Sequence, residues 1–282
     1  MKPDDFITTT AGISMPKIIY GTAWKKERTS ALVQQAIGLG FRGIDTACQP
    51  KHYLESGVGE GIVACINRGL LTRPELYVQT KFTSLNGQDP QRVPYDPKSS
   101  LSEQVTQSFQ ASLNNLQTTY LDCLVLHSPL ANQQQTMEVW QAMEKLVKSG
   151  GVKQLGISNC YDLKTLEGLY RDAEIKPAVI QNRFYSDTQY DRAIRDFCQN
   201  NQIIYQSFWT LTANPNVLSD NTLQSLATKY NRSNSQVFFR YLTQIGIVPL
   251  TGTTSATHMQ EDLSIFEFQL NLKECASIEA LL

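Results

Sequence analysis

The chain has 282 residues, of which 41% are hydrophobic and 18% are charged, and its formal net charge is -1. This length is sufficient for one large core or two small ones. The near-neutral charge and the absence of a basic tract argue against nucleic acid or an anionic membrane as a partner. No apolar run approaches the ~20 residues of a membrane span.

Six cysteines stand at positions 48, 65, 123, 160, 198 and 275, with no CxxC pair. In a chain of this size, that spread favours reduced thiols in a cytosol over a disulfide framework. The N-terminal stretch MKPDDFITTT lacks the apolar segment of a signal peptide. No Cys/His cluster has zinc-ligand spacing, so we expect no metal. We expect a cytoplasmic protein that is a monomer.

The first elements predict a small hairpin from Ile7 to Ile19, with its turn at Ala11-Gly12. After it, a short β-branched or aromatic run is followed by an amphipathic helix, again and again. The runs are nearly all apolar, as in parallel strands that are covered on both faces. The expected strands are Lys17–Tyr20, Phe41–Ile44, Leu76–Thr80, Leu121–Leu126, Gln154–Ile157, Ala178–Gln181, Ile203–Gln206 and Ile247–Leu250.

Helical patterns lie between these runs, for example the apolar residues that recur every three or four positions from Leu101 to Leu116. Eight strand–helix units of roughly 30 residues come close to the ~250 residues of a closed barrel. A doubly wound open sheet is the alternative, but the turn after the first strand, Gly21 to Trp24, lacks the GxGxxG spacing. We predict an α/β fold, a (β/α)8 TIM barrel with an N-terminal β-hairpin cap, as a single domain over residues 1–282.

Ionisable residues stand at the carboxyl ends of the second, third and fourth expected strands: Asp45, Lys81 and His127. Taken singly, each has an ordinary structural interpretation, as a helix cap, a lysine that reaches solvent and a core histidine. In a closed barrel, however, these strand ends meet at one mouth, where catalytic residues lie. Taken together, the three residues favour a catalytic site.

Tyr53 follows Asp45 in a polar loop and would supply an acid to this site. Tyrosine has a reference pKa of ~10, which a nearby ammonium lowers by stabilising the phenolate. Lys81 would be that ammonium, Asp45 would hold it in place, and His127 would donate a hydrogen bond to the same substrate oxygen. Proton donation of this kind is typically worth ~10²–10⁴ in rate. Such a site supplies no electrons, so a carbonyl substrate implies a nicotinamide cofactor as the hydride source.

The sequence resembles the aldo-keto reductase family over nearly its whole length. The motifs are GFRGIDTA around Asp45, VQTKF around Lys81, and the block SLSEQVTQSFQASLNNLQTTYLDCLVLHSP, which ends near His127. The segment VWQAMEKLVKSGGVKQLGISNC, which follows, is also similar to the corresponding segment of that family. The resemblance implies NADPH-dependent reduction of aldehydes and ketones to alcohols, with Tyr53, Lys81, Asp45 and His127 as the catalytic residues.

The resemblance also implies a set of cofactor contacts. Ser158, Asn159 and Gln181 match residues that hold the nicotinamide carboxamide. Phe208, with Tyr205 as the alternative, matches an aromatic residue that stacks on the nicotinamide ring. The remaining expected contacts are Ala23, Thr251, Thr253, Thr254, His258 and Asp262.

Two segments depart from the family pattern. The loop between Asp45 and Tyr53 has extra residues and must bulge; the alternative is that Tyr53 is only a loop aromatic. In VPLTGTTSATHMQEDL, the lysine expected at an adenosine 2′-phosphate falls on Leu250 or Gly252 and the arginine on His258, so two full charges are missing. Hydroxyls and backbone amides at a helix start can still bind phosphate. We expect NADPH, with NADH as the alternative.

The expected walls of the substrate pocket are Trp24, Trp209 and Phe82, with Leu85 nearby. The sequence ends soon after IFEFQL, which predicts an open pocket, and the stretch 84–98 after the third strand is a candidate lid.

A nucleotide-binding sensor with little turnover is the alternative function. A hydrolytic barrel enzyme would need a metal site or two facing carboxylates at the strand ends, and neither is found.

Overall fold

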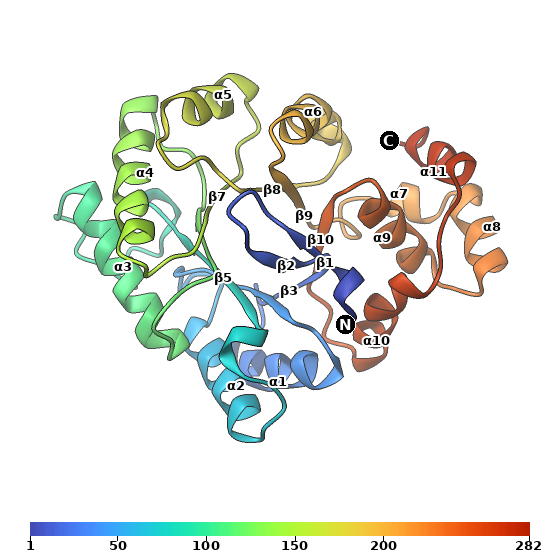
Figure 1. Cartoon of the computed structure of the whole chain (residues 1–282), viewed down its shortest axis with the longest axis horizontal. Coiled ribbons are helices and arrows are strands. Elements are labelled where there is room, and N and C mark those ends of the chain that lie inside the picture. The colour runs from blue at the N-terminus through green and yellow to red at the C-terminus, as the bar shows by residue number, and fades with distance from the viewer.

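The computed structural model describes residues 1–282, apart from the side chain of Pro3. Eight parallel strands form a closed barrel in the order β10-β3-β4-β5-β6-β7-β8-β9, and helices surround it (Figure 1). The predicted barrel is confirmed, and each expected strand overlaps an observed one. The barrel strands are β3 (Ile19–Gly21), β4 (Gly43–Asp45), β5 (Tyr77–Phe82), β6 (Cys123–Leu126), β7 (Leu155–Ser158), β8 (Val179–Arg183), β9 (Ile204–Phe208) and β10 (Val248–Thr251).

The predicted N-terminal hairpin is confirmed, although it is shorter than expected. Its strands β1 (Phe6–Thr8) and β2 (Ser14–Pro16) pair antiparallel and lie across the barrel in Figure 1. Ile19 belongs to the barrel instead, because it pairs with Leu250 of β10. Met15 of β2 is fully buried and packs with residues at the amino ends of the barrel strands, so the hairpin closes the end opposite the predicted site.

Helices follow the barrel strands, and their ends are set by local signals. Ser100 and Glu103 form a capping box at the start of α3, and Gly40, with φ of 123°, ends α1. The helices are α1 (Thr29–Leu39), α2 (Glu55–Asn67), α3 (Leu101–Leu116), α4 (Gln133–Lys148), α5 (Leu163–Asp172), α6 (Arg192–Asn200), α7 (Pro215–Leu218), α8 (Asn221–Tyr230), α9 (Asn234–Gln244), α10 (Ala256–Leu263) and α11 (Leu272–Glu279). Among the described residues, no helix is long and apolar enough to cross a membrane.

Apolar side chains fill the space between the strands and the helices, and a smaller apolar cluster lies inside the barrel toward the hairpin. Above that cluster the interior is polar. Gln79 of β5, Gln181 of β8 and Gln206 of β9 are all buried and hydrogen-bonded to one another or to Asp45. Buried amides of this kind require partners, so the layer is built around the carboxylate at the end of β4.

Candidate active site

Asp45 and Lys81 form a buried ion pair at the carboxyl ends of two adjacent strands, β4 and β5. Lys81 Nζ lies 2.6 Å from Asp45 Oδ1 and 2.7 Å from Oδ2, and it also donates to the carbonyl oxygen of Thr46 at 2.8 Å. The lysine is 1% exposed and the aspartate 3%. Burial acts to lower the pKa of Lys81, but the charge of Asp45 and the neighbouring Tyr53 raise it above its ordinary value. Lys81 is therefore charged in the folded protein.

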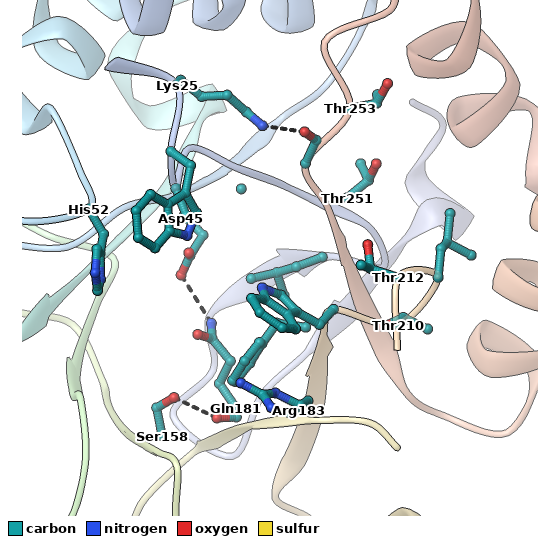
Figure 2. A pocket seen from close by; sticks show the side chains of 18 of the residues that line it. Lys25, Asp45, His52, Ser158, Gln181, Arg183, Thr210, Thr212, Thr251 and Thr253 are labelled. Carbon is teal, nitrogen blue, oxygen red and sulfur yellow. Dashed lines mark hydrogen bonds between the residues drawn. The ribbon is translucent and has the colours of Figure 1, made fainter. Parts of the chain in front are cut away.

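Two glutamines hold the Asp45 carboxylate from the barrel side. Gln79 Nε2 donates to Asp45 Oδ1 at 2.7 Å, and Gln181 Nε2 donates to the same oxygen at 3.0 Å (Figure 2). Gln206 links the two glutamines through its Oε1 atom. With Lys81 added, the carboxylate accepts three hydrogen bonds at Oδ1 and one at Oδ2, which fix its direction. Polar residues inside the apolar strand runs, Gln79 in YVQTKF and Gln206 in IIYQSF, were the sequence signal for this layer.

Tyr53 is brought back toward the ion pair by a turn after Asp45. The backbone NH groups of His52 and Tyr53 both donate to the carbonyl oxygen of Gln49, at 3.1 and 3.0 Å, and this turn takes up the extra residues. Glu55, which starts α2, is fixed by Ser112 and Asn115 of α3, at 2.9 and 3.0 Å. The loop therefore bulges as expected and still returns the tyrosine to the barrel mouth.

The ring of Tyr53 lies beside both other groups. Lys81 Nζ is 5.2 Å from the ring centroid, and the ring of His127 meets that of Tyr53 edge-on with 6.2 Å between centroids. Burial raises the pKa of Tyr53, while the charge of Lys81 acts to lower it. The expected effect of the ammonium is present, but the net direction differs from the sequence expectation because desolvation of the phenolate outweighs it. Tyr53 is therefore a protonated phenol at neutral pH.

His127 follows β6 and is neutral. Burial, together with the charge of Lys81, lowers its pKa to about 3. Its Nδ1 atom lies 2.6 Å from the hydroxyl oxygen of Thr83, and its backbone NH donates to the carbonyl oxygen of Phe82. When the Thr83 hydroxyl donates to Nδ1, the proton of the neutral ring is on Nε2. Thr83 was not among the residues predicted from the sequence.

A cavity of about 900 Å³ opens at this end of the barrel, near the upper end of the ~300–1,000 Å³ typical of small-molecule sites. It runs from the Tyr53 loop and His127 to β10 and α10. Most of the predicted contacts line it: Asp45, Tyr53, His127, Ala23, Trp24, Ser158, Asn159, Gln181, Phe208, Trp209, Thr251, Thr253, His258 and Asp262. Lys81 lies behind this surface, against Asp45.

Residues on β7 and β8 form the floor between the two ends of the cavity. The Ser158 hydroxyl donates to the carbonyl oxygen of Gln181 at 2.6 Å (Figure 2), and Asn159 Nδ2 donates to the carbonyl oxygen of His127 at 2.9 Å. Both amide hydrogens of Gln181 are used, toward Asp45 and Gln206. The atom that Gln181 can offer to a ligand is therefore its carbonyl oxygen, a hydrogen-bond acceptor.

The wall at β10 differs in detail from the sequence expectation. The hydroxyl of Thr251 donates to Asp262 Oδ2 at 2.7 Å, and burial raises the pKa of that carboxyl to about 6. Thr253 Oγ1 accepts from the backbone NH of Ser255, so its own proton is available to a ligand. Thr254 is exposed and does not line the cavity, so its contact with the cofactor stays a prediction.

Phe82 and Tyr205 also lie outside the cavity. Phe82 is 1% exposed and packs on Tyr95 in the core, because it directly follows Lys81 on β5 and so points to the opposite face of the strand. The expectation that it forms a wall of the substrate pocket is wrong. Tyr205 is 3% exposed and donates to Asp191 at 2.9 Å, so of the two aromatic candidates on β9 only Phe208 reaches the cavity.

The candidate lid, residues 84–98, is packed onto the barrel in its middle and near its end. Gln88 Nε2 donates to the carbonyl oxygens of Cys48 and Thr83, at 2.9 and 3.1 Å, and the Tyr95 hydroxyl donates to the carbonyl oxygen of Thr83 at 2.9 Å. Within this stretch Gly87 touches the cavity and Leu85 does not. In this structure the segment therefore braces the Tyr53 loop.

Trp24 and Trp209 stand at the rim of the cavity with left-handed backbone, φ of 62° and 55°, and exposed fractions of 57% and 49%. Asn159, on the floor, has φ of 50°. Left-handed backbone is costly for residues other than glycine and gathers at functional sites. Trp24 stacks on His52 with 4.0 Å between centroids, and Trp209 stacks on Arg183, another lining residue that was not predicted.

Comparisons with known proteins identify the family of the chain. The model of the aldo/keto reductase family matches residues 17–282. The uncharacterized oxidoreductase YtbE of Bacillus subtilis is 31% identical, covering 96% of this chain and 90% of that protein, and the glyoxal reductase of the same organism is 30% identical, covering 98% and 92%. A Bombyx mori aldo-keto reductase solved in complex with NADP is 27% identical, with a TM-score of 0.82 and coverage of 98% and 92%.

The family model covers nearly the whole chain, and the barrel, the hairpin and the residues at the strand ends are those that the sequence predicts. The expectation of an NAD(P)H-dependent oxidoreductase is thereby confirmed at the level of the family. The chain belongs to the aldo/keto reductase family.

Proposed function

We propose that this protein reduces aldehydes and ketones to alcohols with NADPH, and that Tyr53 is the proton donor. The observation that carries the proposal is the arrangement of Tyr53 beside the buried Lys81–Asp45 pair and the neutral His127. The bound NADP of the Bombyx mori relative and the reductase name of the Bacillus subtilis relative support the choice of cofactor and reaction class.

The lining residues fit a nicotinamide nucleotide. The Gln181 carbonyl oxygen is free to accept from the NH₂ of a carboxamide, and Ser158 and Asn159 are held next to it. Phe208 presents an aromatic ring at the end of β9. At the far end, Thr253 and the first backbone amides of α10 can bind phosphate. When bound, the cofactor supplies the hydride that these side chains cannot.

The residues of the chain supply the proton and hold the oxygen that receives it. The Nε2–H of neutral His127 donates a hydrogen bond to the carbonyl oxygen of the substrate and orients it. Tyr53 gives its phenolic proton to the same oxygen as negative charge develops there. The phenolate that remains is stabilised by the Lys81 ammonium, which Asp45 fixes in position. The proton therefore leaves with the alcohol, and the charge that remains on Tyr53 lies beside a buried ion pair.

The alternative, a nucleotide sensor with little turnover, needs the cofactor site but not this acid. Measuring NADPH oxidation with an activated carbonyl compound such as phenylglyoxal separates the two functions. We expect turnover of the order of 1–10³ s⁻¹, the usual range for enzymes. Tight NADPH binding without turnover of any aldehyde or ketone tested would favour the sensor.

A further inference from the structure

Arg183 extends the inward face of β8 toward the mouth of the cavity. Side chains alternate along a strand, so Arg183 is on the same face as Gln181, ~6–7 Å further along. Gln181 contacts Asp45, and Figure 2 shows Arg183 on the same side of the cavity, beside Gln181. Across the sheet, Arg183 pairs with Phe208, the proposed neighbour of the nicotinamide ring. Arg183 therefore lies next to the reacting end of the cavity.

The guanidinium of Arg183 has no acidic partner. Among the described side chains it makes no ion pair and no hydrogen bond, and its Nε atom is buried without a partner. It is held instead by aromatic rings, 4.3 Å from the centroid of Trp209 and 5.1 Å from that of Tyr185. Its backbone NH donates to the Tyr161 hydroxyl at 3.0 Å. Stacking fixes the plane of the group and leaves its N–H donors unused.

The other cations of the site are already engaged. Lys81 is bonded to Asp45, and Lys25 donates to the carbonyl oxygen of Gly252 (Figure 2). His127 is neutral. Arg183 is thus the full positive charge at the reacting end that remains available to a ligand, and a planar fork of N–H donors matches a carboxylate or a phosphate in two parallel hydrogen bonds.

We propose that Arg183 binds the carboxylate of the substrate, which makes oxo acids a preferred substrate class of this enzyme; this rests on the proposed function. The same chemistry would suit a phosphate of the cofactor. The position of Arg183 favours the substrate, because the groups suited to phosphate, Thr253 and the start of α10, follow β10, whereas Arg183 stands on β8 two residues after Gln181.

Two substrates with the same reacting ketone provide the test: phenylglyoxylate, a 2-oxo acid, and its uncharged methyl ester. For Arg183→Met, we expect the ratio of kcat/KM for phenylglyoxylate to that for the methyl ester to fall at least tenfold, mainly through KM for phenylglyoxylate. Arg183→Lys keeps the positive charge but lacks the two parallel N–H donors of the guanidinium. Its ratio should lie between those of the wild type and the methionine variant. Arg192→Met removes an exposed arginine of α6 and serves as the control, with an unchanged ratio.

Binding measured by calorimetry separates this proposal from the proposed function. If neither substrate is turned over, the proposed function fails, but the dissociation constant of phenylglyoxylate with the NADP⁺ complex still tests Arg183. An equal loss for both substrates, together with weaker NADPH binding, would assign Arg183 to a cofactor phosphate. That result, or an unchanged ratio and dissociation constant in a folded Arg183→Met protein, would overturn the proposal.

Discussion

The hydroxyl oxygen of Thr83 lies 2.6 Å from Nδ1 of His127. This contact joins the residue after β5 to the residue after β6, and it occupies Nδ1, so Nε2 is the ring nitrogen that remains for a ligand. A neutral imidazole carries one proton, and a donor at Nδ1 places that proton on Nε2. We propose that the Thr83 hydroxyl is this donor and so makes His127 a hydrogen-bond donor toward the cavity.

Replacing Thr83 by valine should remove this control with little change in shape. We expect kcat/KM for phenylglyoxal to fall about tenfold, the equivalent of one hydrogen bond of ~1.4 kcal/mol. Thr83→Ser keeps the hydroxyl and should retain most of the activity. Steady-state kinetics of the two variants checks this. If valine and serine have the same effect, the hydroxyl does not orient His127.

The pH profile should show no ionisation from His127 in the neutral range. Its pKa is lowered to about 3 by burial and the charge of Lys81, so the ring stays neutral above about pH 4. Burial raises the pKa of Tyr53. An acid must be protonated to act, so activity is lost only as pH rises through the pKa of Tyr53. We expect kcat/KM for reduction to be level from about pH 5 to 9 and to fall at higher pH. A fall centred near pH 6.5 would contradict this assignment.

Asp45→Asn should destabilise the protein because it leaves the buried Lys81 ammonium without its counter-ion. Breaking one side of a buried pair costs ~3–5 kcal/mol. The pair raises the pKa of Lys81 in the folded state, so its contribution is complete below the ordinary lysine pKa and is lost as pH rises above it. Urea denaturation at neutral pH measures the change. Asp187→Asn, at an exposed position, is the control and should differ by less than ~0.5 kcal/mol.

Asp262→Asn should favour NADPH over NADH. Asp262 lines the far end of the cavity, where its carboxyl accepts from Thr251, and its pKa of about 6 leaves it mostly charged at pH 7.5. Removing a negative charge close to a 2′-phosphate is worth ~1 kcal/mol, or about fivefold in affinity. Fluorescence titration with both nucleotides gives the ratio of dissociation constants. Glu60→Gln, on the exposed face of α2, should leave this ratio unchanged. Equal changes for both nucleotides would remove Asp262 from the phosphate end.

The barrel could be predicted because its strands are covered on both faces and read as short apolar runs between helical patterns. The strand-end residues Asp45, Lys81 and His127 could be placed for the same reason, since the carboxyl ends of the strands share one mouth. The predicted bounds of the strands were less accurate. The first barrel strand starts at Ile19, whereas a start at Lys17 was expected. The short β-branched stretch there continues from the hairpin without a break in pattern.

The misplaced and missed residues have two physical origins. Strand alternation places Phe82 opposite Lys81 and Arg183 beside Gln181, so that signal was present in the sequence. The contact of Thr83 with His127 depends on the relative register of β5 and β6, which no local pattern contains. The binding of Thr251 to Asp262 likewise depends on how α10 packs behind β10. An analysis of the sequence one helix or strand at a time therefore predicts neither contact.

The most direct test of the account is single-turnover reduction of phenylglyoxal by the NADPH complex of Tyr53→Phe. Without the phenolic proton, the rate of NADPH oxidation should fall by ~10²–10⁴, the usual contribution of a general acid. Phenylalanine keeps the ring packed against His127 and Lys81, so the loss reports on the hydroxyl alone. A single-turnover rate in the folded variant equal to that of the wild type would show that the proton comes from another group.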